Sequence, residues 1–288
     1  MTDNERYELV RLGENVHGIH SHAYGETCHP IIGPEREARH LYVEGLDLPA
    51  RLAARAGKPL VIWDVGLGSA ANPLTLLHAL GPVPGTVCIH SFDRTSAPLI
   101  FALEQASKLP FLLGFEDPVR ALITQGSVSF RHKQLQVQWR FVQADFPSVL
   151  RSPESAAWPK PHALLFDPHS PARNPEMWTL PLFASLLARL DPDRPCALST
   201  YSRSTLVRTA MLMAGFYVGR GGGAGAKEET TLAANCLGLL RHPLEASWLE
   251  RIRHSSSAEP LREGIYAQTP LLPSTLARLK AHPQFRSP

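Results

Sequence analysis

Four aspartates each follow a short apolar run, the position that ligand-binding groups take at the strand ends of an α/β sheet. They are Asp64, Asp93, Asp145 and Asp167. The first lies in the stretch KPLVIWDVGLGSAAN, residues 58–72, and is followed by Gly66 and Gly68. Glycines here let the chain turn sharply and let a ligand approach the main chain. The pattern predicts a buried strand over 59–65, a helix over 73–80, and a nucleotide-type cofactor at the turn between them.

Two classes of cofactor fit this turn. Gly66, Gly68 and Ala71 match a dinucleotide fingerprint loosely, and Asp93 follows the next predicted strand, where an acid can hold ribose hydroxyls. The same features suit S-adenosylmethionine. Asp64 favours the latter, because its carboxylate would repel a pyrophosphate but attract a sulfonium and an amino group. A glycine turn with no ligand remains the structural alternative.

The other two acids extend the same site. Asp145 ends a third strand, where it is placed to contact the adenine amino group or to cap the next helix. Asp167 ends the fourth strand, over 162–166, beside the expected methyl group. In a methyl transfer to nitrogen, a carboxylate there can position the amine and help to remove its proton. A plain turn residue before proline is the alternative for Asp167.

The composition is that of an ordinary globular chain of 288 residues, with 44% hydrophobic and 19% charged residues. It contains no apolar run of membrane-spanning length and no secretory signal, and its four cysteines lack metal-site spacing, so a cytoplasmic protein is expected. His17, His20, His22 and His29 also lack regular ligand spacing, and no metal site is predicted. The net charge of +3 resides entirely in residues 241–288, which is too small an excess to indicate a nucleic-acid partner by itself.

The order of the predicted elements is typical of a methyltransferase rather than a dehydrogenase. Strands and helices alternate up to a helix over 205–214, and segments 216–220 and 230–240 then form an antiparallel pair. Segments 128–130 and 136–142 are predicted to form a hairpin that leads into the third core strand. We therefore predict a Rossmann-like α/β fold with a mostly parallel seven-stranded sheet. The expected domain comprises residues 58–240. An N-terminal extension (1–57) packs on it, and a C-terminal tail (241–288) with one short helix over 244–253 follows it.

A more specific signal follows the fourth strand. The run FDPHSPARNPEMWT, residues 166–179, resembles a motif of the tRNA wobble-uridine methyltransferases, the methyltransferase half of bifunctional MnmC-type enzymes and their stand-alone relatives. The cofactor turn, LSTYSRSTLVRTAMLMAGF (198–216) and GETCHPIIGPEREARHLYVEG (25–45) are also similar to that family. The resemblance implies S-adenosylmethionine-dependent N-methylation of 5-aminomethyl-2-thiouridine at tRNA position 34. It implies methylation only, since no flavin oxidase half is expected here, and upstream tRNA-modification enzymes would supply the aminomethyl group.

The resemblance also assigns residues. The cofactor would be held by Asp64, Gly66, Gly68, Asn72, Asp93 and Asp145, and Asp167 would contact the reacting amine. The substrate would be bound by His169, Asn174, Pro175, Met177, Trp178, Tyr201 and Lys227. His169 replaces the family's usual phenylalanine, so it either stacks on a base or accepts a proton. The alternatives are an N-methyltransferase for a small molecule or protein, and a non-catalytic RNA-binding relative.

Overall fold

The computed structural model describes residues 6–28, 32–222 and 229–286. Its main element is an eight-stranded sheet in the order β10-β11-β9-β8-β4-β5-β7-β6. The five central strands are parallel: β9 (Ala197–Thr200), β8 (Ala163–Phe166), β4 (Leu60–Val65), β5 (Gly85–Asp93) and β7 (Leu135–Gln143). Three antiparallel strands flank them: β11 (Thr230–Ala234), β10 (Tyr217–Gly221) and, at the other edge, β6 (Ser127–His132).

The sheet confirms the predicted fold class and corrects the predicted number of strands. The terminal antiparallel pair β10–β11 lies at one edge, as expected. The prediction of seven strands was wrong because β6, the first arm of the predicted hairpin, is a full edge strand that pairs with β7 over six residues. The second arm of the terminal pair is also shorter than predicted, since Leu237–Leu239 forms a 3-10 turn instead of continuing β11.

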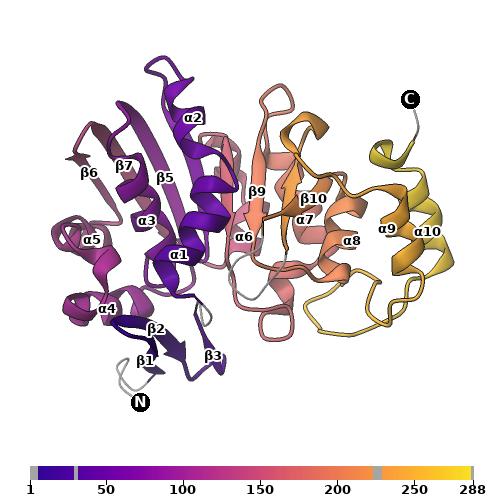
Figure 1. Ribbon diagram of the computed structural model, residues 1–288, viewed down its shortest axis with the longest axis horizontal. Helices are drawn as coiled ribbons and strands as arrows, with labels where there is room; N and C mark the ends of the chain where they lie inside the picture. Colours follow the sequence, from indigo (N-terminus) through magenta and orange to yellow (C-terminus); the bar gives the residue numbers. More distant parts are fainter. Residues whose placement is uncertain (1–5, 29–31, 223–228, 287–288) are drawn as a thin grey trace.

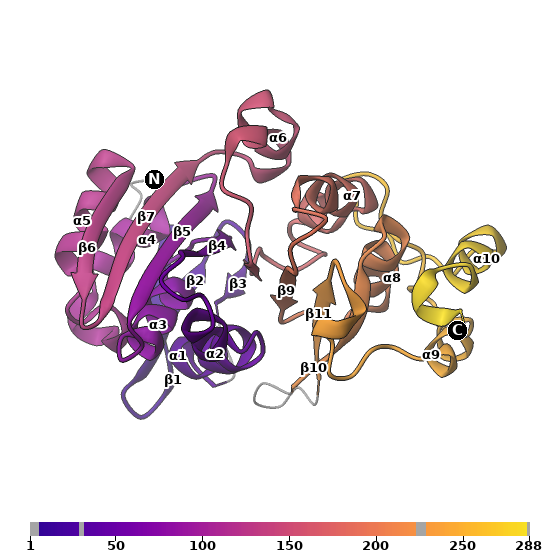
Figure 2. The ribbon, with the colours of Figure 1, turned by 90° about the horizontal axis from the view of Figure 1, so that it is seen from above.

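The central strand β4 is buried on both faces, which explains its continuous apolar sequence. Leu60 and Ile62 point into one core, and Val61, Trp63 and Val65 point into the other. Helices therefore cover both faces of the sheet (Figure 2). A one-residue slip of this strand would exchange its two side-chain sets between the cores, so the pairing register is strongly determined.

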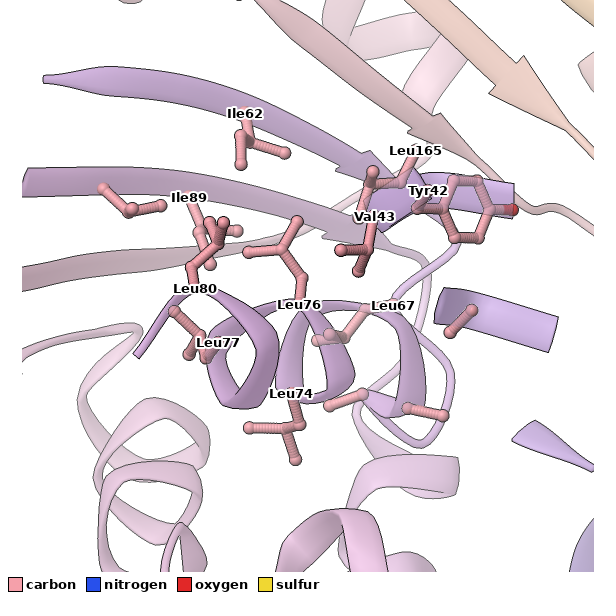
Figure 3. Packing of buried hydrophobic residues seen from close by; sticks show 14 of the residues in the cluster. Tyr42, Val43, Ile62, Leu67, Leu74, Leu76, Leu77, Leu80, Ile89 and Leu165 are labelled. Atoms are coloured by element: carbon pink, nitrogen blue, oxygen red, sulfur yellow. The ribbon is translucent and has the colours of Figure 1, made fainter. Parts of the chain in front are cut away.

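The first core is covered by helices from the N-terminal half of the chain. They are α1 (Pro34–Ala38), the π-helix η2 (Arg39–Glu44), α2 (Leu48–Ala53), α3 (Ala71–Leu80), α4 (Ala97–Glu104) and α5 (Glu116–Gln125). Leu76 and Leu80 of α3 point towards Ile62 and Ile89 in the sheet, whereas Leu74 points to the opposite side of the helix (Figure 3). Full burial of one such side chain contributes about 1.5–3 kcal/mol. This packing fixes the start of α3, which follows the glycine turn.

The second core is covered by helices from the C-terminal half. They are α6 (Phe146–Arg151), α7 (Leu180–Arg189), α8 (Thr205–Ala214), α9 (Ala246–Ile252) and α10 (Pro273–Lys280). Of residues 241–288, the sequence predicted only α9. The structure adds α10, which contacts α8 and α9 and buries Leu279 (Figure 2). Short 3-10 helices connect several elements: η3 (Ala106–Lys108), η4 (Pro110–Leu112), η5 (Pro153–Ala157), η6 (Pro175–Trp178), η7 (Leu237–Leu239) and η8 (Pro283–Phe285).

A separate three-stranded sheet precedes α1, and the sequence analysis did not predict it. Its strands β1 (Tyr7–Gly13), β2 (Val16–Ser21) and β3 (Glu26–Thr27) pair antiparallel in this order (Figure 1). We call it the N-terminal sheet. Tyr7 packs on Phe101 of α4, with ring centroids 6.0 Å apart. Among the described residues, none of the helices combines the length and the apolar character that crossing a membrane requires.

Candidate active site

A cavity of about 460 Å³ lies where the central strands end. Its floor comes from the carboxyl ends of β4, β5 and β8, the usual place for a ligand in a doubly wound sheet. Among the residues that line it are nine of those predicted from the sequence: Gly66, Gly68, Asn72, Asp93, Asp167, His169, Asn174, Met177 and Tyr201. Segments up to 135 positions apart in the sequence, from Gly66 to Tyr201, thus form one wall because they follow strands of the same parallel part of the sheet.

The two glycines of the turn serve different purposes. Gly66 has φ +92°, and a Cβ built on it would lie 2.7 Å from the main-chain oxygen of Asp167. It therefore allows the loops after β4 and β8 to pass closely. Gly68 has φ +52°, and a Cβ there would meet no atom within 4 Å. Its main chain borders the open cavity, which is the cradle that a bound cofactor needs.

Asp93 is joined to this turn. Its carboxylate accepts hydrogen bonds from the main-chain N–H of Gly68 at 3.0 Å and of Thr95 at 3.3 Å. Burial raises the pKa of Asp93, and these two N–H groups oppose the rise. A carboxylate held in this way at the end of β5 has further lone pairs with which to accept the hydroxyls of a ribose.

Asp167 faces the same cavity from the end of β8. Its carboxylate accepts a hydrogen bond of 2.7 Å from the side-chain amide of Asn72, the second residue of α3. Burial, followed by the charge of Asp167, raises the pKa of Tyr42 well above its usual value. The next main-chain carbonyl, that of Pro168, accepts a hydrogen bond of 3.0 Å from the hydroxyl of Tyr201. These contacts fix the positions of Asp167 and Pro168 in the loop after β8.

His169 contacts the N-terminal sheet and the turn that joins β2 to β3. Its ring stacks on Tyr24, with centroids 3.8 Å apart and an interplanar angle of 20°. Its Nδ1 lies 3.4 Å from a carboxylate oxygen of Glu26 in β3, and Glu26 also accepts hydrogen bonds from the main chain and hydroxyl of Ser170. The sequence analysis did not assign Tyr24 or Glu26 to the site. The only signal for Glu26 was the resemblance of the segment 25–45 to the family, and Tyr24 lies just outside that segment. A strand of two residues also leaves no periodic pattern.

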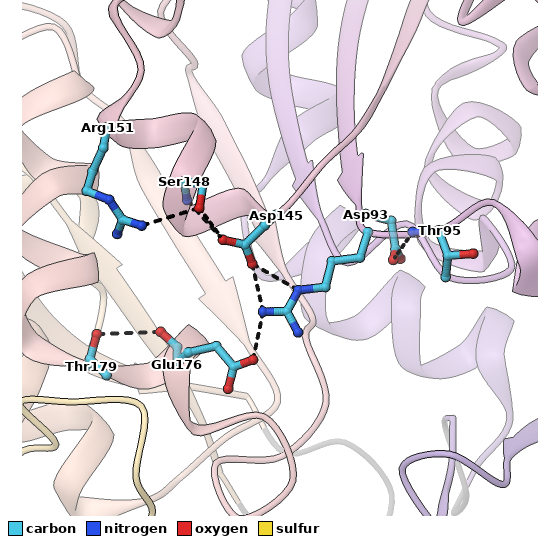
Figure 4. A network of polar contacts seen from close by, with 8 residues as sticks. Asp93, Thr95, Asp145, Ser148, Arg151, Glu176 and Thr179 are labelled. Carbon is cyan, nitrogen blue, oxygen red and sulfur yellow. Dashed lines mark hydrogen bonds and ion pairs between the residues drawn. The ribbon is translucent and has the colours of Figure 1, made fainter.

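The lining of the cavity is acidic. Four carboxylates reach it, from Glu26, Glu37, Asp93 and Asp167. Arg94 also lines it, but its guanidinium pairs with Asp145 and Glu176 at 2.7 Å each. Figure 4 shows this network beside Asp93. Such a lining suits cationic groups, such as a sulfonium or an ammonium, and disfavours a pyrophosphate.

Two of the predicted cofactor residues do not line the cavity. Asp145 caps α6 by accepting from the N–H of Ser148 and pairs with Arg94, which is the helix-cap alternative (Figure 4). Asp64 is fully buried in β4 and accepts a hydrogen bond of 2.7 Å from Ser91. Burial raises the pKa of Asp64 to about 7. Because Asp145 pairs within the protein and Asp64 does not reach the cavity, their direct contact with a cofactor stays a prediction that this geometry does not support.

The remaining predicted substrate residues divide in the same way. Asn174 and Met177 line the cavity, whereas Pro175 and Trp178 do not. Trp178 supports the loop outside the cavity, since its Nε1–H donates to the main-chain oxygen of His169 at 2.8 Å. Lys227 lies outside the described residues. The predicted substrate wall is therefore partly a support for the loop that carries Asp167 and His169.

Two histidines near the N-terminus, His20 and His22, lie close to Glu8, which their spacing in the sequence does not show. Glu8, His20 and His22 each place one possible metal-ligating atom within 4.8 Å of the others, because Glu8 lies opposite His20 in the β1–β2 pair. Glu8 and His22 are exposed, and they also form an ion pair at 3.9 Å. The absence of a metal site stays a prediction.

Comparison with known proteins identifies the class. Residues 121–236 match the family described as S-adenosyl-L-methionine-dependent methyltransferase. The crystal structure of MNMC2 from Aquifex aeolicus has the same fold, with a TM-score of 0.66 and 21% identity over 96% of this chain and 85% of that one. The chain is an S-adenosyl-L-methionine-dependent methyltransferase, which confirms the predicted class and cofactor.

Within this class the chain is similar to one kind of enzyme. It is 30% identical over 226 residues to the tRNA 5-methylaminomethyl-2-thiouridine biosynthesis bifunctional protein MnmC of Methylibium petroleiphilum, which covers 73% of this chain and 32% of that protein. The MnmC protein of Pseudomonas putida is 28% identical over 241 residues, 81% of this chain and 35% of that protein. The chain thus spans about a third of the length of these relatives, and the predicted resemblance is confirmed.

Proposed function

We propose that this methyltransferase acts on tRNA and methylates the aminomethyl nitrogen of 5-aminomethyl-2-thiouridine at wobble position 34. The names of the similar MnmC proteins include the biosynthesis of 5-methylaminomethyl-2-thiouridine in tRNA. An N-methylation of the aminomethyl group would produce that nucleoside. An earlier modification step must then supply the aminomethyl group, and the substrate would place the enzyme in the cytoplasm.

The acidic lining of the cavity is the observation that carries this proposal. Both reactants of such a transfer are cations before reaction, since the methyl donor is a sulfonium and a free aminomethyl group is largely ammonium at neutral pH. Glu26, Glu37, Asp93 and Asp167 supply the opposite charge in one cavity. The attraction between unlike charges is stronger there than in bulk water, because the effective dielectric constant is lower.

Each group has a distinct part in the proposed reaction. Asp93, beside Gly68, accepts the ribose hydroxyls of the cofactor. Asp167, fixed by Asn72, holds the acceptor nitrogen close to the methyl carbon. The cofactor supplies the methyl group, and the residues of the chain align the nitrogen and exclude water. Alignment of this kind accounts for a large part of the rate of a displacement reaction.

A methyl-transfer assay tests the proposal. Cofactor with a labelled methyl group would be incubated with tRNA that carries 5-aminomethyl-2-thiouridine, followed by nucleoside analysis. We expect label in 5-methylaminomethyl-2-thiouridine and little label in the same tRNA without the aminomethyl group. Transfer to a small amine or a protein, with none to the tRNA, would instead support an N-methyltransferase for another acceptor. Cofactor binding without transfer to any acceptor would indicate a non-catalytic RNA-binding relative.

A further inference from the structure

Glu26 and His169 approach each other from parts of the chain that are 143 positions apart in the sequence. Glu26 belongs to β3 of the N-terminal sheet, and His169 belongs to the loop after β8. A carboxylate oxygen of Glu26 lies 3.4 Å from Nδ1 of His169, and both residues line the cavity that holds Asp167. A carboxylate next to one nitrogen of an imidazole is the arrangement that orients a histidine for proton transfer.

The histidine ring is fixed by further contacts. Tyr24 stacks on one face at a centroid distance of 3.8 Å, and the indole N–H of Trp178 binds the main-chain oxygen of His169 at 2.8 Å. Glu26 contacts Nδ1, so Nε2 is the ring nitrogen that can serve an acceptor in the cavity that His169 lines. With a proton on Nδ1 facing Glu26, the lone pair of the neutral ring lies on Nε2.

We propose that His169 is the catalytic proton acceptor of this methyltransferase and that Glu26 is the residue that positions it. The inference deepens the proposed function, on which it rests for an amine as the acceptor. Asp167 then holds the ammonium in place and need not take its proton. The N-terminal sheet becomes part of the catalytic machinery through Glu26 and Tyr24.

The proposed reaction begins with removal of a proton from the acceptor. The acceptor enters as R–NH₃⁺, and one proton moves from its nitrogen to Nε2 of His169, which leaves R–NH₂ and an imidazolium beside Glu26. The nitrogen lone pair forms a bond to the methyl carbon while the carbon–sulfur bond breaks. The electron pair of that bond stays on sulfur, which gives the neutral thioether, S-adenosylhomocysteine. The product is R–NH₂⁺–CH₃, and the imidazolium later releases its proton to water.

The charges around His169 fit this role. Burial lowers the pKa of His169, while the carboxylates of Glu26, Asp93 and Asp167 oppose that effect. They face the ring from β3, from the end of β5 and from its own loop, and the neighbouring Tyr24 contributes its aromatic face. The ring is therefore neutral at the start of the cycle, and the imidazolium that forms is stabilised by three negative charges.

The pH dependence of single-turnover methyl transfer gives a kinetic test. Glu26→Gln keeps the size of the side chain but removes its charge, so the pKa of His169 should fall further. We expect the acid limb of the profile to move down by about one pH unit and the plateau rate to fall roughly tenfold. Ser170→Ala is the matched control, because it removes one contact of Glu26 with the loop but keeps the charge beside His169. Its midpoint should remain that of the wild type.

A second measurement does not depend on the acceptor. NMR titration of the histidine ring carbons, in protein saturated with S-adenosylhomocysteine, would report the pKa of His169 directly. The signal would be assigned by its loss in His169→Phe. We expect the pKa to be lower in Glu26→Gln than in the wild type and unchanged in Ser170→Ala. Equal values in the wild type and Glu26→Gln would overturn the role of Glu26, even if the true acceptor were still unidentified.

His169→Phe separates a proton acceptor from a stacking residue, since phenylalanine keeps the stack on Tyr24. With whichever acceptor the wild type methylates, we expect transfer to fall by about 10²-fold or more, while cofactor affinity is retained. Activity within about tenfold of the wild type would overturn the proposal and return proton removal to Asp167. If the wild type does not methylate the aminomethyluridine tRNA, the tRNA proposal fails, and the NMR titration still decides the Glu26–His169 pair.

Discussion

The two walls of the cavity come from regions with different sequence signatures. The floor consists of loops that follow β4, β5 and β8, and each of these loops begins after a buried strand. The opposite wall is the N-terminal sheet, whose strands are short or irregular and half exposed. The floor supplies Asp93 and Asp167, and the N-terminal sheet supplies Glu26, with Tyr24 in the turn between β2 and β3.

This difference separates the part of the site that the fold provides from the part that is specific to this enzyme. A parallel sheet directs its strand ends to one edge, so the floor can bind a cofactor wherever the fold occurs. The N-terminal sheet contacts the acceptor side through His169 and Ser170. Because the resemblance predicts phenylalanine at the position of His169, we expect this wall to determine how the acceptor is oriented and deprotonated.

The largest expected effect is at the floor. Asp167→Asn should lower methyl transfer by about 10²–10³-fold, because it removes the charge that holds the acceptor ammonium. The affinity for the cofactor, measured by calorimetry, should change little. The amide of Asn72 donates to Asp167, so Asn72→Ala is a useful control that should weaken transfer less. Full activity in Asp167→Asn would move the acceptor site away from the floor.

A second variant tests the close approach of two floor loops. Gly66→Ala places a methyl group 2.7 Å from the carbonyl oxygen of Asp167 at φ +92°, and should destabilise the fold by about 2–3 kcal/mol. Gly57→Ala is the control, because Gly57 also has a positive φ of +84° but open space around it. Gly57→Ala should lower the free energy of unfolding by about 1 kcal/mol. Urea denaturation that gives equal losses for both variants would rule out the close approach.

A third variant addresses the cofactor. Asp93→Ala removes a half-buried carboxylate that binds Gly68 and, in our proposal, the ribose. The affinity for S-adenosylmethionine should fall by roughly 1.5–3 kcal/mol, as measured by calorimetry. Glu26→Gln, in the other wall, should leave that affinity within about threefold. If the two variants weakened the cofactor equally, the separation of cofactor and acceptor walls would be wrong.

The smallest effect concerns Asp64, which lies beneath the floor. Burial raises its pKa to about 7, so the folded protein keeps a proton that the unfolded chain loses near pH 4. Its contribution to stability is thus present at low pH and is lost as the pH rises towards 7. Relative to the wild type, Asp64→Asn should gain about 1–2 kcal/mol in unfolding free energy between pH 5 and pH 8. If the unfolding free energies of Asp64→Asn and the wild type differed by the same amount at every pH, and the variant lost much of its cofactor affinity, the direct contact predicted from sequence would be restored.

The sequence predicted the floor because its signals are local. An apolar run, two glycines and an acid suffice to mark the end of β4, and α8 was predicted with its observed bounds, Thr205–Ala214. Asp64 and Asp145 show the limit of this reasoning. Their positions at strand ends were read correctly, but the direction of each side chain depends on partners such as Ser91 and Arg94 that no spacing rule identifies.

The N-terminal sheet was missed for a physical reason. β3 has two residues, and β1 is half exposed and partly irregular, so neither has a clear alternation of apolar and polar residues. Helix α10 was missed in the same way, since it buries only Thr275 and Leu279. Elements that are stabilised by docking onto a finished core leave little periodicity in the sequence.

The central claim is that the two walls form one acceptor site, and a double-mutant cycle of Glu26→Gln and Asp167→Asn tests it most directly. Both carboxylates act on His169, so single-turnover rates should be non-additive, with a coupling of about 1 kcal/mol or more. The measurement requires four proteins at one pH with the same tRNA acceptor. Coupling of this size would show that the N-terminal sheet and the floor act together in methyl transfer. Effects that add within about 0.3–0.5 kcal/mol would contradict the account.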